Sequence, residues 1–240
     1  MRRRAVAAGL AMMLSGVAAA HDLRGSLGGA DTLTPSPRPV PPRWRGSFWE
    51  VPNGGLAIQV PRANLERDVA VVLTGASVPE MRQPVTARVE GGRCVPGTLV
   101  VAPGTTLTVD NEDLLAHEFY VVRAGQTEPV VASELTASRT RRQLSLPAAG
   151  AYELRDQRQP QFRCWIVAGP GQGRVLPVDR TGAFSVSGLE DGTYTVKAYF
   201  EGAERASGEV TVAGREATVT LSLGGEAAPA HEDTHRHRDH

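Results

Sequence analysis

Histidine is the side chain of this sequence with the widest chemistry, since it can bind a metal or exchange a proton near neutral pH. The 240-residue chain has six. A Ser-His-Asp triad in the body of the chain would have to use His117, the one histidine between His21 and the C-terminal tail. The sequence has no Gly-x-Ser-x-Gly, no His-Glu-x-x-His and no phosphate-binding glycine loop with a lysine. We therefore expect no enzymatic activity.

The C-terminal segment, residues 225–240, carries four of the histidines: His231, His235, His237 and His240. It has almost no apolar content to fold around, so we expect it to be disordered. Imidazoles spaced two and four residues apart in a flexible chain can converge on one zinc, nickel or copper ion. The alternative is a solvated polar tail without a metal.

Residues 1–20 have the pattern of a signal peptide. Arg2–Arg4 form the charged region, Ala5–Val17 the apolar stretch and Ala18–Ala20 a small-residue cleavage site. We expect a periplasmic or secreted protein. Cleavage after Ala20 would make His21 the first residue, whose amine and ring together can chelate copper, with His117 as the candidate second histidine. The alternative is a coincidence of the cleavage site.

The two cysteines, Cys94 and Cys164, are an even count in a chain expected outside the cytosol, which favours a disulfide. The alternative is two separate buried thiols. Lys plus Arg equal Asp plus Glu at 26 each, which gives no basic face for nucleic acid. No segment after residue 20 has the ~18 consecutive apolar residues of a membrane span. We expect an unidentified protein or surface as the partner.

The elements that would position these side chains are short strands separated by turns. Residues 21–46 are rich in Gly, Pro, Ser and Thr and predict a flexible leader. A short helix is expected over Glu128–Ala137. Alternating or apolar runs predict strands near 56–60, 69–73, 85–89, 98–101, 105–109, 118–122, 143–146, 151–155, 162–168, 183–187, 193–200, 208–212 and 217–223. Many short strands indicate an all-β sandwich or barrel.

Two longer segments span several of these strands: Thr106–Tyr120 (TLTVDNEDLLAHEFY) and Ala148–Ala168 (AAGAYELRDQRQPQFRCWIVA). Both resemble the ligand-bearing segments of cupredoxins, the small plastocyanin-like copper proteins. The resemblance spans roughly residues 65–168 and implies a Greek-key β-sandwich. It places His117 at the first histidine ligand. Asp156 then stands where the family has its Cys ligand, Gln159 at the second His and Phe162 at the Met.

These substitutions remove the thiolate and the second imidazole that a type 1 copper site needs, so we expect no blue-copper centre. One interpretation is a metal-free remnant, in which His117 faces Asp156 or Gln159. A hydrogen-bonded His–Asp pair would then hold the two loops together in place of the metal. Asp156 could also pair with one of three nearby arginines, Arg155, Arg158 and Arg163. The other is a non-standard copper or zinc site at the same remnant position, made by His117, Asp156 and Gln159, with Glu118 as an optional further ligand.

The stretch Asp179–Val196 (DRTGAFSVSGLEDGTYTV) resembles the carboxypeptidase regulatory-like, or transthyretin-like, β module. The resemblance implies a small, non-catalytic β-sandwich over residues 169–224, after a cupredoxin-like domain over residues 47–168. The prediction is an exported, non-enzymatic binding protein built on a cupredoxin that has lost its type 1 site. The alternative is a periplasmic copper-binding or electron-transfer protein with a non-standard site at His117.

Overall fold

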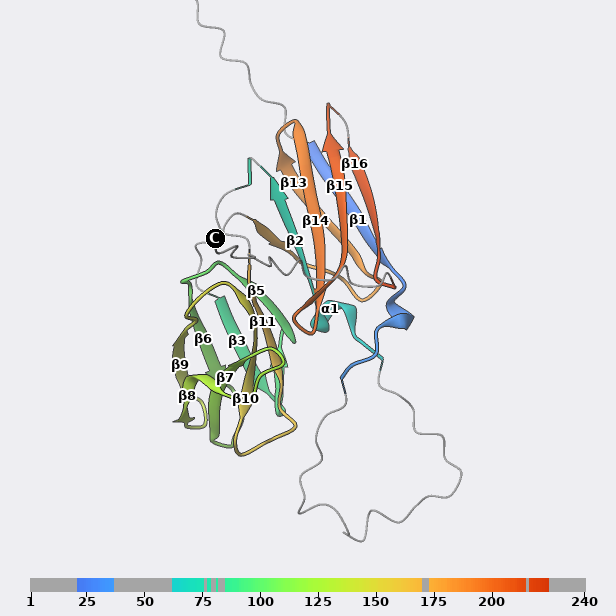
Figure 1. Cartoon of the computed structure of the whole chain (residues 1–240). Coiled ribbons are helices and arrows are strands. Elements are labelled where there is room, and N and C mark those ends of the chain that lie inside the picture. Colours follow the sequence, from blue (N-terminus) through green and yellow to red (C-terminus); the bar gives the residue numbers. More distant parts are fainter. Residues whose placement is uncertain are drawn as a thin grey trace, which may run out of the picture.

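The computed structural model describes residues 21–36, 62–75, 77–78, 81, 85–169, 173–214 and 216–224. Strands form nearly all of the regular secondary structure in the described part, which confirms the all-β prediction. Figure 1 shows two β-sandwiches, one above the other. The predicted signal peptide, the strand predicted near 56–60 and the four tail histidines lie outside the described residues.

The first sandwich uses one continuous stretch of chain. Its five-stranded sheet has the order β5-β11-β10-β7-β8, formed by Thr98–Val101, Cys164–Ala168, Gly150–Asp156, His117–Arg123 and Pro129–Thr136. The facing sheet has the order β4-β3-β6-β9, formed by Arg93–Val95, Val85–Glu90, Thr106–Asn111 and Arg141–Ser145. Alternate side chains point inward, so that Leu107, Val109, Leu154 and Ile166 form its core.

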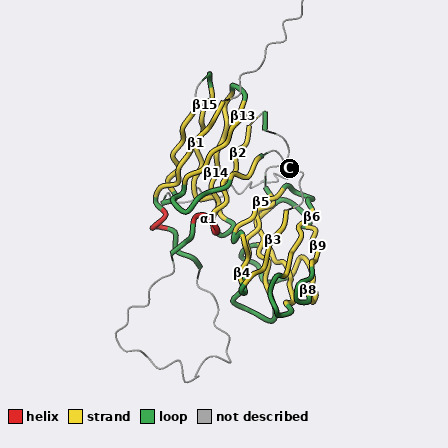
Figure 2. Tube along the Cα trace, turned by 180° about the vertical axis from the view of Figure 1, so that it is seen from behind, coloured by secondary structure: helices red, strands yellow, loops and turns green. Residues whose placement is uncertain are grey.

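The second sandwich gathers strands from three separate parts of the chain, as the tube in Figure 2 shows from behind. A three-stranded sheet has the order β13-β1-β16, formed by Ala183–Leu189, His21–Gly28 and Ala217–Ser222. A four-stranded sheet has the order β12-β2-β14-β15, formed by Arg174–Leu176, Val69–Gly75, Gly192–Phe200 and Ala203–Val212. Two short helices accompany it, η1 (Ala30–Thr32) and α1 (Leu65–Asp68).

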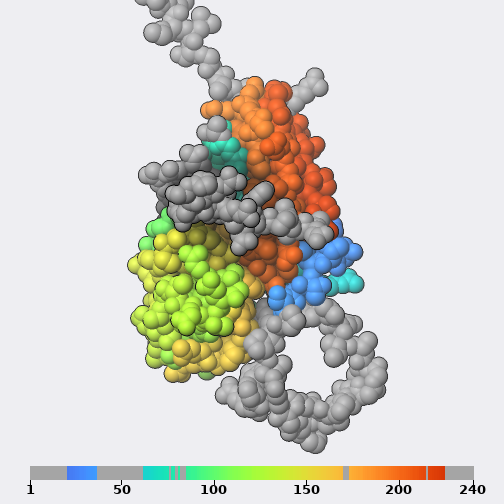
Figure 3. Space-filling view, in the orientation of Figure 1, coloured from blue at the N-terminus to red at the C-terminus, as the bar shows by residue number. Residues whose placement is uncertain are grey.

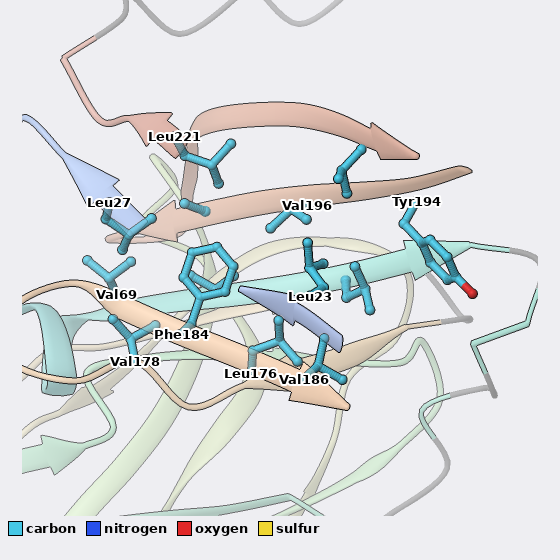
Figure 4. Close-up of a cluster of buried hydrophobic side chains, with 14 of the residues drawn as sticks. Leu23, Leu27, Val69, Leu176, Val178, Phe184, Val186, Tyr194, Val196 and Leu221 are labelled. Atoms are coloured by element: carbon cyan, nitrogen blue, oxygen red, sulfur yellow. The ribbon is translucent and has the colours of Figure 1, made fainter. Parts of the chain in front are cut away.

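The expected leader over residues 21–46 is wrong in its first part, because β1 is the central strand of a sheet. It pairs antiparallel with β13 and parallel with β16. Its apolar side chains Leu23 and Leu27 are buried beside Phe184 and Val196, as Figure 4 shows. Gly25 is required there, since a Cβ atom at this position would lie 2.1 Å from the Phe184 ring.

The expected range of the first domain, residues 47–168, is wrong in its early part, because β2 belongs to the later sandwich. It pairs with β14 over its whole length and with β12 through its middle residues, Val71–Leu73. Its odd-numbered side chains, such as Val71 and Leu73, enter the core of the second sandwich. Ala70 and Val72 point the other way, toward Val100 on β5 and other residues of the first sandwich. A strand buried on both faces has no alternation to reveal its partners.

The segment Glu128–Ala137, expected to be helical, forms the edge strand β8. It pairs antiparallel with β7, with irregular register around Val121. Val130, Val131 and Thr136 are β-branched and favour an extended chain, while Ala132, Glu134 and Leu135 favour a helix. The ladder with β7 outweighs the weak helical preference of the latter three residues.

The two sandwiches pack against each other through a small apolar contact and a few hydrogen bonds. Ala70, Val72 and Tyr199 of one meet Val100 and Val167 of the other. The Thr98 hydroxyl donates to the Asp68 carbonyl at 2.7 Å and accepts from the Glu201 amide at 3.2 Å. The Gly97 amide donates to the Arg67 carbonyl at 2.7 Å. Figure 3 shows the two as adjacent masses, with residues of the first in green and yellow and most of the second in orange.

Candidate functional site

The loop between β6 and β7 is fixed by Asn111, whose side chain is fully buried. Its amide donates to the carbonyls of Leu115 at 2.9 Å, Thr136 at 3.2 Å and Ala137 at 2.9 Å. Its side-chain oxygen accepts from the Asp113 amide at 3.0 Å. One side chain thus satisfies four backbone groups and sets the path of the chain into His117.

His117 begins β7 with its side chain fully buried and both ring nitrogens bonded to carboxylates. Nδ1 lies 2.7 Å from Oδ2 of Asp156, and Nε2 lies 3.0 Å from Oδ2 of Asp113. Asp156 ends β10, the neighbour of β7, so the sheet register brings it beside His117. The three residues, called here the Asp-His-Asp cluster, join the two segments that resemble the cupredoxin ligand loops.

Both carboxylates have further donors. Oδ1 of Asp156 accepts from the amides of Glu118 and Arg158, each at 2.9 Å. Asp113 accepts from the amides of Gly91 and Gly92 after β3. The cluster therefore connects backbone from both sheets of the first sandwich, and its buried charges are hydrogen-bonded as burial requires.

Two phenylalanine rings enclose the imidazole. Phe119 stacks on it with ring centroids 5.1 Å apart and planes inclined by 8°. Phe162, at the position of the family's Met ligand, is fully buried with its ring centroid 6.3 Å from that of His117. A cation over an aromatic face is attracted by the ring, so this stacking suits a charged imidazole.

The electrostatics favour an ion pair. Burial opposes the charge of His117, but the hydrogen bond and charge of Asp156, followed by those of Asp113, outweigh it and raise the pKa of His117. Burial likewise opposes the charge of Asp156, but the hydrogen bond from His117 and two backbone amides lower the pKa of Asp156. The two shifts agree in direction, and together they favour a charged imidazole at His117 bonded to a carboxylate at Asp156.

Of the residues considered for the remnant site, Asp156 meets His117, while the Glu118 and Gln159 side chains lie elsewhere. The Glu118 carboxylate lies near Ser133 and Arg158, at 3.4 Å and 3.8 Å. Gln159 lines a shallow surface depression with Leu115, Ala116 and Arg158.

The arginines proposed as partners of Asp156 have other side-chain partners. Arg155 and Arg163 pair with Glu153, at 2.8 Å and 3.4 Å, and Arg158 reaches Asp156 only through its backbone amide. The sequence analysis does not predict Asp113 as a partner of His117. The sequence does place Asp113 close to it, four residues earlier and within the turn that the cupredoxin resemblance identifies.

The donor set does not fit a copper or zinc ion between His117 and Asp156. Two ligands of a tetrahedral zinc ion at ordinary bond lengths lie about 3.3 Å apart. The 2.7 Å between Nδ1 and Oδ2 is a hydrogen-bond distance, and Phe162 supplies no donor. Among the described residues, no group of three or more His, Cys, Asp or Glu side chains has the arrangement of a metal site.

His21 and His117 lie in different sandwiches. His21 begins β1, and its Nε2 lies 3.1 Å from Oδ1 of Asp191. Both ring nitrogens of His117 are already bonded to carboxylates. The structure therefore does not bring the two together as copper ligands.

Cys94 and Cys164 form the predicted disulfide, with their Cα atoms 5.4 Å apart. It links β4 to β11 and so joins the two sheets of the first sandwich. A crosslink separated by 70 residues stabilises a fold by about 4 kcal/mol on the chain-entropy model.

Comparison with known proteins finds similarity at the level of fold. No family model and no curated sequence matches the chain. A copper-containing nitrite reductase from Thermus scotoductus is 23% identical over 35% of this chain and 22% of its own length, with a TM-score of 0.31. Amicyanin from Paracoccus versutus is 15% identical over 40% of this chain and 95% of its own, with a TM-score of 0.32. A purple cupredoxin from Nitrosopumilus maritimus is 17% identical over 35% and 97%, with a TM-score of 0.30.

The chain is all-β, and the Asp-His-Asp cluster joins the two stretches whose sequences resemble the ligand-bearing segments of cupredoxins. No helix in the described ranges is both long and apolar enough to cross a bilayer.

Proposed function

We propose that this protein is an exported, non-enzymatic binding protein, in which the Asp-His-Asp cluster has taken over the structural role of a copper ion. The observation that carries the proposal is the pair of hydrogen bonds from His117 to two carboxylates in the interior. A bound ion holds its ligand loops together by coordination, and here two charge-assisted hydrogen bonds connect the same loops.

The burial of His117 supports a non-enzymatic role. A general base has to lie within hydrogen-bond reach of the proton that it removes from the substrate. The His117 side chain is 0% exposed and both its nitrogens are bonded. Reaction at this ring would require opening of the loop that Asn111 closes with three donated hydrogen bonds.

Two further features support export and a second module. The disulfide between Cys94 and Cys164 is typical of oxidising compartments. The stretch that resembles the carboxypeptidase regulatory-like module forms the turn at Asp179, β13, and β14. We propose that the second sandwich is such a module, extended by β1 and β2.

Metal analysis tests the proposal against its copper-binding alternative. The protein, with and without residues 225–240, is incubated with Cu(II) or Zn(II), dialysed and analysed for bound metal. We expect no bound metal and no intense thiolate-to-copper absorption from the shortened protein. About one equivalent that persists in the shortened protein and disappears in His117→Phe would contradict the proposal and support the alternative.

A further inference from the structure

A cavity of about 400 Å³ lies where the two sandwiches meet, and none of its walls comes from the Asp-His-Asp cluster. The first sandwich supplies Arg93 and Trp165, and the chain around the second supplies Arg62, Arg67 and Glu201. The volume falls within the roughly 300–1,000 Å³ of small-molecule sites, which lie preferentially between domains.

Among the described residues, the lining carries more positive than negative charge. These residues include four arginines, Arg62, Arg67, Arg93 and Arg163, against two carboxylates. Asp68 is bonded to Arg67 at 2.7 Å, and Glu201 accepts from the Ser36 amide at 3.0 Å. Both carboxylates are therefore engaged with neighbours from their own sandwich or the adjoining chain.

Arg62 and Arg93 are the cations available to a ligand. Within the part of the chain that the structure describes, neither guanidinium has a hydrogen-bond or salt-bridge partner, and both residues are exposed. They enter the cavity wall from different sandwiches. A guanidinium presents a planar set of donors that matches the two oxygens of a carboxylate or phosphate.

Trp165 supplies an apolar wall beside them. It is the second residue of β11, where its amide donates to the Gly97 carbonyl at 3.0 Å, and it is the partly exposed residue of a strand that is otherwise buried. Its ring lies against Gly202, where an added Cβ atom would be 3.2 Å away. A large, flat and partly exposed ring gains most when another ring covers it.

We propose that this cavity binds a small organic anion, an aromatic ring that carries a carboxylate or a phosphate. The acid group pairs with Arg62 and Arg93, and the ring covers Trp165. The inference rests on the proposed function, since it supplies the ligand class of the proposed binding protein. It involves none of the residues of the Asp-His-Asp cluster.

Isothermal titration calorimetry on the full chain tests the assignment with four probes: benzoate, phenyl phosphate, inorganic phosphate and benzyl alcohol. We expect saturable binding of benzoate or phenyl phosphate that weakens as salt is raised, and no binding of benzyl alcohol. The stronger of the two anions identifies the acid group. Binding of inorganic phosphate as tight as that of phenyl phosphate would overturn the assigned contact with Trp165.

Variants locate the site. Arg62→Gln and Arg93→Gln each remove one charged partner and should weaken binding about tenfold or more. Arg174→Gln is the matched control, since Arg174 is an exposed arginine on β12, paired with Leu73 of β2, and does not line the cavity. Equal losses in all three variants, or no binding by any of the four probes, would overturn the proposal. Metal retention at His117 would instead overturn the proposed function and leave the anion titrations unaffected.

Discussion

The two sandwiches have similar sheets but different interiors. In the described part of the chain, every buried polar or charged residue belongs to the first sandwich, from Thr98 to Asp156. The second has an apolar core of Leu, Val, Phe, Ala and Tyr side chains. The first sandwich therefore depends on polar contacts at fixed positions, whereas the second depends on burying apolar area brought from distant parts of the chain.

The largest effect should follow disruption of β1. Leu23→Asp places a charge at a fully buried position of the central strand and should cost more than about 4 kcal/mol. Hydrogen exchange should show lost protection in β1, β13 and β16, with protection kept in β6, β7 and β10. Asp22→Asn, at the exposed neighbouring position, is the control. Retained protection in β13 and β16 would show that β1 is dispensable.

The pairing of β1 could not be predicted from the sequence. The cupredoxin resemblance located His117 and Asp156 because the motif residues lie within two short stretches of chain. The role of β1 depends on β13 and β16, which lie more than 150 residues away and leave no local trace. Gly25 and Ser26 are residue types common in linkers, but Gly25 is required in β1 because a larger residue would clash with the Phe184 ring.

The contact between Asp113 and His117 could not be predicted for another reason. The cupredoxin-like motif identified the turn that contains Asp113. Which carboxylate faces each ring nitrogen of His117 depends on side-chain geometry, which sequence spacing does not determine. The disulfide was predictable from the even cysteine count together with the expected export of the chain. The helix expected over Glu128–Ala137 failed because pairing with β7 decides the structure of an edge segment with mixed preferences.

The next largest effect concerns the buried ion pair. Asp156→Ala leaves His117 without its nearest carboxylate and should cost about 3–5 kcal/mol in urea unfolding. The double variant His117→Phe/Asp156→Leu makes this region apolar, like the core of the second sandwich, and should recover most of the loss. A double variant as unstable as Asp156→Ala would show that the first sandwich needs these polar contacts to fold.

A smaller effect is expected where the sandwiches meet. Thr98→Val removes the hydroxyl that bonds to Asp68 and Glu201 and should cost about 1–3 kcal/mol. Thermal unfolding should then show the two sandwiches separating into two transitions. Thr108→Val, on β6, is a control expected to stay within about 0.5 kcal/mol. A single unchanged transition for Thr98→Val would show that the apolar contact alone joins them.

The smallest effect is the dependence of stability on pH. Since the pKa of His117 is raised, its contribution is complete below about pH 6.5 and is lost as pH rises through the higher folded value. Since the pKa of Asp156 is lowered, its contribution is complete above about pH 3.9 and is lost as pH falls through the lower folded value. Stability from the pair should therefore be greatest between these limits.

Urea unfolding at several pH values measures this profile, and the double variant His117→Phe/Asp156→Leu is its reference. The difference in unfolding free energy between the two proteins should decline on the alkaline side and on the acid side. A difference that is constant from acid to alkaline pH would mean that the pair carries no net charge interaction.

The most direct measurement is a nitrogen-15 NMR titration of the histidine rings in the full-length protein, with His117→Phe used to assign the signal. We predict that His117 at neutral pH has a proton on both ring nitrogens and releases one only at a pH above the ordinary histidine range. A neutral ring with the ordinary pKa, or a ring nitrogen bound to metal, would contradict the conclusion that an ion pair stands in place of copper.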